Sequence, residues 1–172
     1  MSSEVKHDHR YPPKKATLHL LCGKIASGKS TLSAKLAASP GTVLISEDRW
    51  LAALYADEMH SVADYVQYSL KLRNAMKPHL VSLLEAGVSV VLDFPANTLA
   101  NRDWMMSIIT ESGAEHCLHY LKVADEVCKS RLHARNAAGS HDFSATDEQF
   151  HQITRYFVEP GADEGFHVIE HP

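Results

Sequence analysis

Eight consecutive residues near the start of the chain have the types and spacing that bind phosphate. Gly23-Lys24-Ile25-Ala26-Ser27-Gly28-Lys29-Ser30 matches G-x-x-x-x-G-K-[ST] in full. The glycines let the backbone curl so that successive amide groups point inward, and a following helix adds partial positive charge. We expect Lys29 to reach the β- and γ-phosphates and Ser30 to offer a hydroxyl to Mg²⁺. The motif predicts a nucleoside triphosphate site with these expected binding residues: Gly23, Lys24, Ile25, Ala26, Ser27, Gly28, Lys29, Ser30 and Thr31.

A first carboxylate, Asp93, ends the apolar segment Val88–Asp93. A carboxylate at the end of a buried strand near a phosphate loop can hold Mg²⁺ directly or through water, so Asp93 joins Ser30 as an expected metal ligand. The alternative is an ordinary aspartate that caps the next turn. No glutamate follows Asp93, because Phe94 and Pro95 stand there. The usual water-activating glutamate of motor ATPases is missing, which favours transfer to another acceptor over hydrolysis.

A second carboxylate, Asp48, lies just beyond the short apolar strand expected at Val43–Ile45. If that strand neighbours the strand before the phosphate loop, Asp48 faces the γ-phosphate from the acceptor side. It could then take the proton of an attacking hydroxyl as a general base. The alternative is that Asp48 caps a helix expected over Trp50–Met59, with Glu47 as a solvated neighbour.

Two arginines, Arg131 and Arg135, are four residues apart on an expected helix over Asp125–Asn136, so they share one face. A polar loop follows. This is how a lid, here expected over about residues 131–146, carries cations onto transferring phosphates and screens them from water. The alternative is a solvated basic helix, but its only carboxylates lie in the first turn.

The acceptor pocket is harder to define. Asn97 and Arg102 follow the strand that ends at Asp93, and Arg49 is adjacent to Asp48, so these three are candidate substrate contacts. Nearby aromatic residues could also line a pocket, although aromatics at helical spacing usually belong to the core.

The elements that must position these residues alternate along the chain. Apolar runs typical of buried strands are followed by segments with helical spacing. We expect strands at Ala16–Cys22, Val43–Ile45, Val88–Phe94, His116–Val123 and His167–Glu170, and helices at Gly28–Ala38, Trp50–Met59, Val62–Ala86, Asn101–Glu111, Asp125–Asn136 and Asp147–Val158. Pro78 should begin a new helix or kink the old one. Such alternation predicts one doubly wound α/β domain with about five parallel strands and its ligand at their carboxyl ends.

Composition excludes several classes of protein. The chain has 172 residues, about one domain, and we expect a flexible lead over residues 1–15 followed by the domain over residues 16–172. The net charge of −4 disfavours nucleic acid as a partner. No apolar run is long enough to span a membrane, and three cysteines without a C-x-x-C pair point to a reducing cytoplasm. His116, Cys117 and His119 lie close together, but incidental histidines on a strand are the simpler interpretation than a zinc site.

The motifs also narrow the class of phosphate-loop protein. GTPases need a guanine-reading N-K-x-D, and no asparagine here is followed by lysine. The length leaves no room for the second domain of a helicase or motor.

The set formed by Gly23–Ser30, Asp48, Asp93, Arg131 and Arg135 resembles the small phosphate-loop kinases related to polynucleotide kinase, chloramphenicol phosphotransferase, gluconate kinase and zeta-type toxins. From about Leu18 to Glu164 the chain resembles bacterial AAA-type ATP-binding proteins described as predicted kinases. The matching segments are Cys22–Thr31, Ser46–Trp50, Val90–Thr98 and Arg135–His141. One departure is Leu51, which stands where polynucleotide kinases pair their base with an arginine.

This resemblance implies a three-layer α/β/α phosphate-loop NTPase fold, similar to nucleoside monophosphate kinases with a short lid. It implies ATP and Mg²⁺, with Lys29, Asp48, Arg131 and Arg135 as catalytic residues. We therefore expect an ATP-dependent kinase that phosphorylates a hydroxyl of a small molecule, acting as a monomer or homodimer. The alternatives are a nucleic-acid or nucleotide kinase, and an ATP-binding switch or toxin-like protein without metabolite turnover. The sequence names neither the acceptor nor a preference for ATP over GTP.

Overall fold

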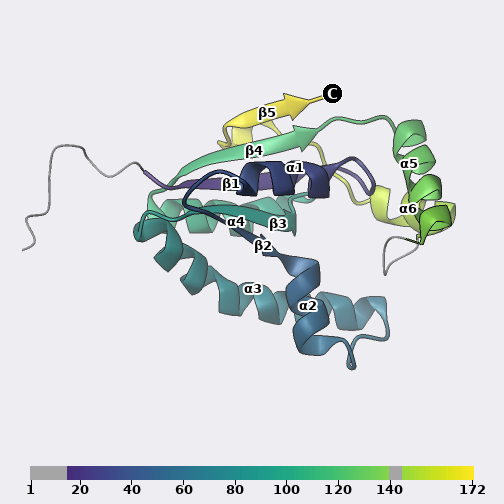
Figure 1. Ribbon diagram of the computed structural model, residues 1–172, viewed down its shortest axis with the longest axis horizontal. Helices are drawn as coiled ribbons and strands as arrows, with labels where there is room; N and C mark the ends of the chain where they lie inside the picture. The colour runs from purple at the N-terminus through teal and green to yellow at the C-terminus, as the bar shows by residue number, and fades with distance from the viewer. Residues whose placement is uncertain (1–14, 140–144) are drawn as a thin grey trace, which may run out of the picture.

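The fold is known from a computed structural model that describes residues 15–139 and 145–172. Its centre is a parallel sheet of five strands in the order β2-β3-β1-β4-β5 (Figure 1). The strands are β1 (Thr17–Cys22), β2 (Thr42–Ser46), β3 (Ser89–Pro95), β4 (Glu115–Leu121) and β5 (Val168–His171). This confirms the expected α/β class and the number and direction of the strands.

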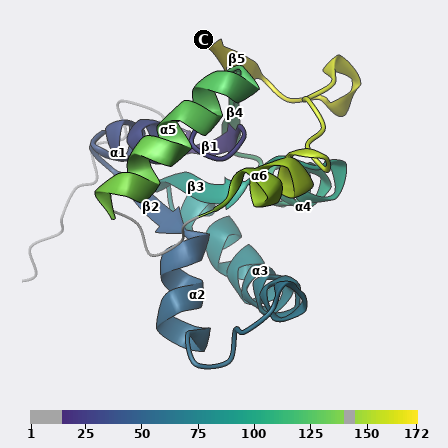
Figure 2. The ribbon, with the colours of Figure 1, turned by 90° about the vertical axis from the view of Figure 1, so that its right-hand side faces the viewer.

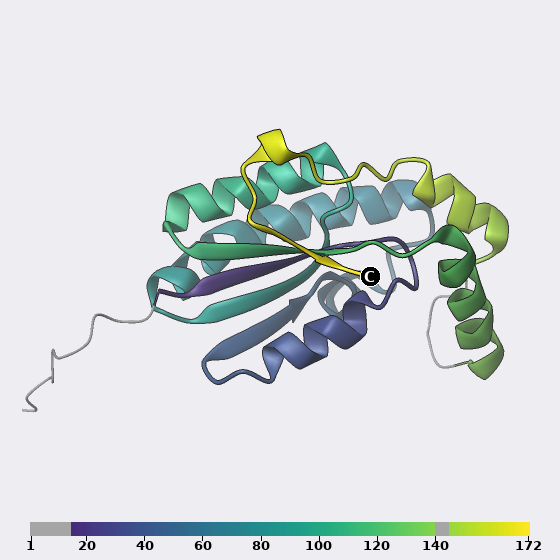
Figure 3. The same cartoon turned by 90° about the horizontal axis from the view of Figure 1, so that it is seen from above.

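Helices cover both faces of the sheet. They are α1 (Lys29–Ala37), α2 (Glu47–Tyr55), α3 (Val62–Glu85), α4 (Leu99–Ser112), α5 (Asp125–Ala138) and α6 (Asp147–Thr154), with a 3₁₀ turn η1 at Ala162–Glu164. Figure 3 shows α1 on one face, α3 and α4 on the other, and α5 and α6 beyond the carboxyl ends of the strands. The three-layer arrangement expected from the sequence is therefore confirmed.

The main core lies between the sheet and the layer of α3 and α4. Alternate residues of β1, Leu18, Leu20 and Cys22, are fully buried there because side chains of a strand alternate between its two faces. Helix α3 meets them with an apolar row at helical spacing, formed by Leu72, Met76, Leu80 and Leu84. The central strand β1 is thus firmly packed, and it supports the loop that follows at its carboxyl end.

Several element boundaries differ from the expectations; α2, for example, ends at Tyr55 rather than Met59. Helix α2 begins at Glu47 rather than Trp50, because Ser46 in extended conformation is its N-cap and the next residues are already helical. Asp48 therefore lies inside the first turn, which corrects the alternative that it caps the helix. Helix α3 continues through Pro78 instead of restarting there. Helix α6 ends at Thr154, and a segment without regular structure follows it.

The region expected to be a lid is helical for its first eight residues. Residues 131–138 form the end of α5, and Gly139, with a φ of 62°, closes that helix in the left-handed conformation that favours glycine. Residues 140–144, including His141, and most of the N-terminal lead lie outside the described residues. Across the ranges that the structure describes, no helix has the length and apolar character needed to cross a membrane.

Candidate active site

The phosphate-binding loop, residues 23–30, connects the carboxyl end of β1 to the start of α1. Gly28 precedes α1 with a φ of 105°, and Ala26 also has a positive φ of 59°. The loop packs so closely at Gly23 that a Cβ there would lie 2.5 Å from the Ser27 Oγ. This tight curl leads directly into the N-terminus of α1, which is the strand–loop–helix arrangement that the motif requires.

Lys29 lies across the loop that contains it. Its Nζ donates hydrogen bonds to the carbonyl oxygens of Gly23, at 2.6 Å, and Lys24, at 2.7 Å. Burial lowers the pKa of Lys29, while the Asp93 carboxylate opposes that shift. The ammonium group is thus held over the loop, where phosphate oxygens would replace two carbonyl acceptors.

The loop also contains a buried polar atom that needs a ligand. The Oγ of Ser27 is buried and has no hydrogen-bond partner among the described residues. A buried hydroxyl without a partner costs free energy, so one aimed at a loop of inward amide groups fits a phosphate oxygen. The residues present therefore fit a polyphosphate.

Asn97, which the sequence suggested as a substrate contact, holds the phosphate-binding loop instead. Its Oδ1 accepts from the Gly23 amide at 2.9 Å, and its Nδ2 donates to the Gly23 carbonyl at 3.0 Å. Asn97 follows β3 directly, and β3 pairs with β1, so the two strand ends are neighbours. The side-chain amide thereby fixes the first glycine of the loop through both of its backbone groups.

Two carboxylates meet at the ends of the neighbouring strands β2 and β3. Ser46, the last residue of β2, pairs with Asp93 of β3, and Asp48 follows two residues later in the first turn of α2. Burial raises the pKa of Asp93, the Asp48 charge raises it further, and Lys29 and Arg49 oppose the rise. Asp93, Asp48, Arg49 and Lys29 therefore belong to one electrostatic group at the edge of the loop.

Arg131 of α5 contacts the phosphate-binding loop, and Arg135 adds positive charge near Lys29. Arg131 donates through Nη1 to the Ser27 carbonyl at 3.2 Å. The positive charge of Arg135 is close enough to contribute to the lowered pKa of Lys29. A further tie was not expected: Lys24 Nζ contacts Asp125 Oδ1 at 2.5 Å, which joins the loop to the first turn of α5. This helix thus places two cations beside the loop.

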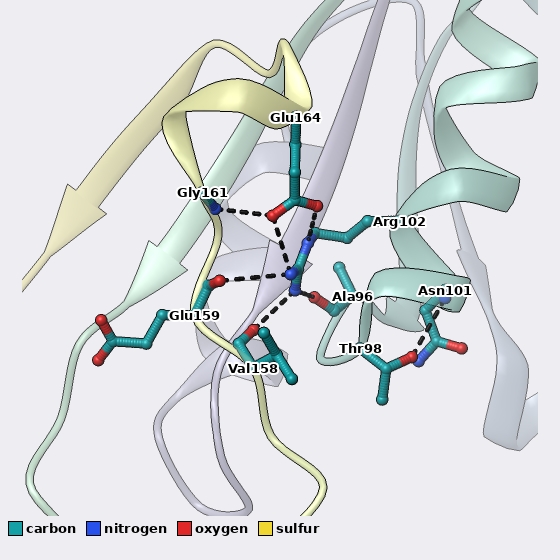
Figure 4. A network of polar contacts seen from close by, with 8 residues as sticks. All are labelled: Ala96, Thr98, Asn101, Arg102, Val158, Glu159, Gly161 and Glu164. Carbon is teal, nitrogen blue, oxygen red and sulfur yellow. Dashed lines mark hydrogen bonds and ion pairs between the residues drawn. The ribbon is translucent and has the colours of Figure 1, made fainter.

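Arg102 corrects the sequence-based expectation. It was a candidate substrate contact, but its side chain is 0% exposed and cannot meet a ligand. Figure 4 shows its guanidinium within the C-terminal segment, where it pairs with Glu164 at 2.6 Å. The same group also donates to the carbonyl oxygens of Ala96, Val158 and Glu159. Arg102 therefore anchors this segment to α4, which is a structural role.

A hollow of about 430 Å³ opens beside the loop, on the side of α1. Ser27, Gly28 and Thr31 form one wall, and Arg131 with the C-terminal His171 and Pro172 forms the other. Its volume is within the range of small-ligand pockets.

A zinc site at His116, Cys117 and His119 was the less simple interpretation of the sequence. Among the residues described, no three or more His, Cys, Asp and Glu side chains are arranged to hold a metal ion. His119 instead lies between two other histidines, with Nε2 3.1 Å from His19 Nδ1 and Nδ1 3.0 Å from His171 Nε2.

A parallel sheet with a phosphate-binding loop after β1, an aspartate at the end of β3 and arginines on α5 defines a small phosphate-loop kinase fold. The family model AAA_33, described as an AAA domain, matches residues 18–160, and the chain belongs to that family. No curated protein matches the chain.

Solved structures share this fold at low identity. A candidate kinase from Chloroflexus aurantiacus is 17% identical, with a TM-score of 0.71 over 91% of this chain and 85% of that one. A chain of the Pnkp1/Rnl/Hen1 RNA repair complex is 17% identical, with a TM-score of 0.66 over 90% of this chain and 46% of that one. The APS kinase CysC of Mycobacterium tuberculosis, in complex with AMPPNP and APS, is 18% identical, with a TM-score of 0.53 over 84% and 98%. Fold and family together support an ATP-dependent kinase.

Proposed function

We propose that this protein transfers the γ-phosphate of Mg·ATP to a hydroxyl group of a small molecule. The observation that carries the proposal is the meeting of Asp48 and Asp93 at neighbouring strand ends, beside the Lys29 ammonium. One carboxylate is partly buried and close to the loop, as a magnesium ligand should be. The other is exposed, in the first turn of α2, where an acceptor can reach it.

Each residue has a distinct part in binding the nucleotide. The inward amide groups of the phosphate-binding loop and Lys29 hold the β- and γ-phosphates. Ser30 and Asp93 would hold Mg²⁺, which when bound neutralises charge on the phosphate oxygens. The nucleobase fits the hollow between Thr31 and Arg131, because this hollow of about 430 Å³ is lined by Ser27 and Gly28 of the loop and by the first turn of α1.

The transfer step needs one base and several cations. Asp48 takes the proton of the acceptor hydroxyl as its oxygen bonds to the γ-phosphorus. The bond from that phosphorus to the β–γ bridging oxygen breaks, and ADP leaves with the electron pair. Lys29, Arg131 and Arg135 stabilise the charge on the transferring group, and pre-placed cations of this kind supply much of the catalysis in phosphoryl transfer.

A polynucleotide kinase is the second candidate, favoured by the likeness to the RNA repair complex chain. Two observations argue for a small acceptor instead. The net charge is −4, which disfavours a phosphate backbone as partner. Leu51 stands where polynucleotide kinases carry an arginine beside the base, and it is 2% exposed, so it packs in the core.

A screen with γ-labelled ATP tests the proposal. Purified protein with Mg²⁺ is incubated with panels of sugars, polyols, hydroxyl-bearing antibiotics, nucleosides and 5′-hydroxyl oligonucleotides. We expect label in a small hydroxyl-bearing compound and none in the oligonucleotides. Label only in oligonucleotides would favour the second candidate, and label only in inorganic phosphate would contradict a kinase.

A further inference from the structure

Helix α2, which contains Asp48, is attached to the rest of the protein along a single row. Glu47 and Leu51 are buried and Tyr55 is half-buried, whereas the other residues of the helix are exposed. These three positions are four residues apart and share one face. Figure 2 shows α2 and the neighbouring part of α3 extending away from the sheet. The orientation of Asp48 therefore depends on few contacts.

The first residue of that row, Glu47, has a buried carboxylate. The Glu47 side chain is 2% exposed, and its Oε1 lies 3.4 Å from Nη2 of Arg73 on α3. Its Oε2 accepts a hydrogen bond from the Tyr65 hydroxyl at 3.3 Å. Arg73 in turn donates through Nη1 to Asn101 Oδ1 of α4 at 2.7 Å. Glu47 thus joins the start of α2 to α3 and, through Arg73, to α4.

A buried ion pair adds little net stability to a fold, because an apolar pair of similar size is often as stabilising. Its main effect here is to fix the orientation of the helix that contains it. Both carboxylate oxygens of Glu47 have specific partners, so turning α2 about its axis would leave a buried charge unpaired. Asp48 is the next residue, about 100° further round the helix. The contacts that hold Glu47 toward α3 therefore also hold Asp48 away from α3, toward the site beside Asp93.

We propose that Glu47, paired with Arg73, is the positioning residue of Asp48, which rests on the proposed role of Asp48 as the base. With 1% exposure overall, Glu47 cannot itself reach an acceptor. It acts through Asp48 alone. The pair connects the catalytic turn to the helices behind it, so the distance from the base to the γ-phosphate is set by an ion pair outside the site.

Glu47→Gln tests the kinetic part, since glutamine keeps the size and the acceptor for Tyr65 but removes the charge. With the acceptor from the screen, we expect kcat to fall about 10- to 100-fold, as a small misplacement of a catalytic group does. The KM for ATP should stay within twofold. In an Asp48→Asn background the same change should cost less than twofold in kcat. If Glu47→Gln lowers kcat as much in the Asp48→Asn background as it does in wild type, the proposal is overturned.

Glu164→Gln is the matched control, because it weakens a different buried pair, the one with Arg102 in the first turn of α4. It should lower Tm while leaving kcat of the folded protein within twofold. An equal loss of kcat in this variant would mean that Glu47→Gln reports general loosening, and the proposal would fall.

Hydrogen exchange of the free protein separates this proposal from the proposed function. In Glu47→Gln, amides of residues 51–55 should exchange at least tenfold faster than in wild type, while those of α1 stay within twofold. Unchanged exchange in α2 overturns the positioning role whatever reaction the protein performs. If no acceptor takes the label but α2 exchange rises, only the proposed function fails.

Discussion

Asn97 shows how one side chain can preset a phosphate-binding loop. It satisfies both backbone groups of Gly23, a residue that has no room for a side chain of its own. The loop is therefore held in its binding conformation before any nucleotide arrives. Preorganisation of this kind raises affinity because less conformational freedom is lost on binding.

Asn97→Ala should weaken Mg·ATP binding by about tenfold, since each lost hydrogen bond contributes on the order of 1 kcal/mol and part is recovered from water. Titration calorimetry of the variant against wild type measures this. Asn74→Ala, at an exposed position on α3, is the control and should bind normally. Equal affinity in Asn97→Ala and wild type would show that the loop needs no such tether.

Single residues differ in how far the sequence predicts them. The phosphate-binding loop could be predicted because its eight residues are consecutive and their chemistry is local. Asn97 and Glu47 could not be assigned, because their partners depend on which strands and helices are neighbours. Arg102 was placed wrongly for the same reason: its partner Glu164 lies 62 residues away and comes near only when the C-terminal segment packs on α4.

At the scale of elements, helix α3 continues through a proline. Pro78 has no amide to donate to the carbonyl four residues earlier, a cost that the sequence suggested would end or kink the helix. The apolar row of Met76, Leu80 and Leu84 packs against the sheet on both sides of that point. The free energy gained by burying this row exceeds the cost of the proline within the helix. A pattern in one sequence does not contain that tertiary contribution.

Pro78→Ala should therefore stabilise the protein by roughly 1 kcal/mol, because the restored helical hydrogen bond exceeds the entropy that proline removes from the unfolded chain. Urea unfolding followed by circular dichroism measures the change. His79→Ala, the adjacent exposed position, should change stability little. A Pro78→Ala variant less stable than wild type would mean that the proline is part of a strained geometry on which the packing depends.

At the scale of the whole molecule, three neighbouring strands are joined by histidines. His119 lies between His19 of β1 and His171 of β5, and burial with these two neighbours lowers its pKa to about 4. His171 also lines the hollow proposed for the nucleobase. The chain of rings thus runs across the sheet to the edge of the site.

This arrangement makes stability depend on pH. Between pH 6.5 and about 4 the unfolded chain binds a proton at His119 that the folded protein does not, so stability falls as pH falls through that window. We expect a loss on the order of 2 kcal/mol from this group. Urea unfolding at several pH values gives the free energy of unfolding as a function of pH. This free energy should fall less steeply with falling pH in His119→Gln than in wild type. If the free energy of unfolding changes with pH equally in both proteins, His119 is not the source of the pH dependence.

The fold as a whole was the most predictable level, because apolar segments typical of strands alternate with segments of helical spacing. The order of the strands was not predictable in full. It decides that β2 and β3 are neighbours, and so brings Asp48 and Asp93 together. That juxtaposition is the basis of the proposed kinase reaction.

The most direct test of that reaction is single-turnover transfer of γ-labelled phosphate from Mg·ATP to the identified acceptor, by wild type and by Asp48→Asn. We predict that the variant binds Mg·ATP within twofold of wild type and transfers at least 100-fold more slowly, since it lacks the general base. Transfer by Asp48→Asn at the wild-type rate would contradict the account.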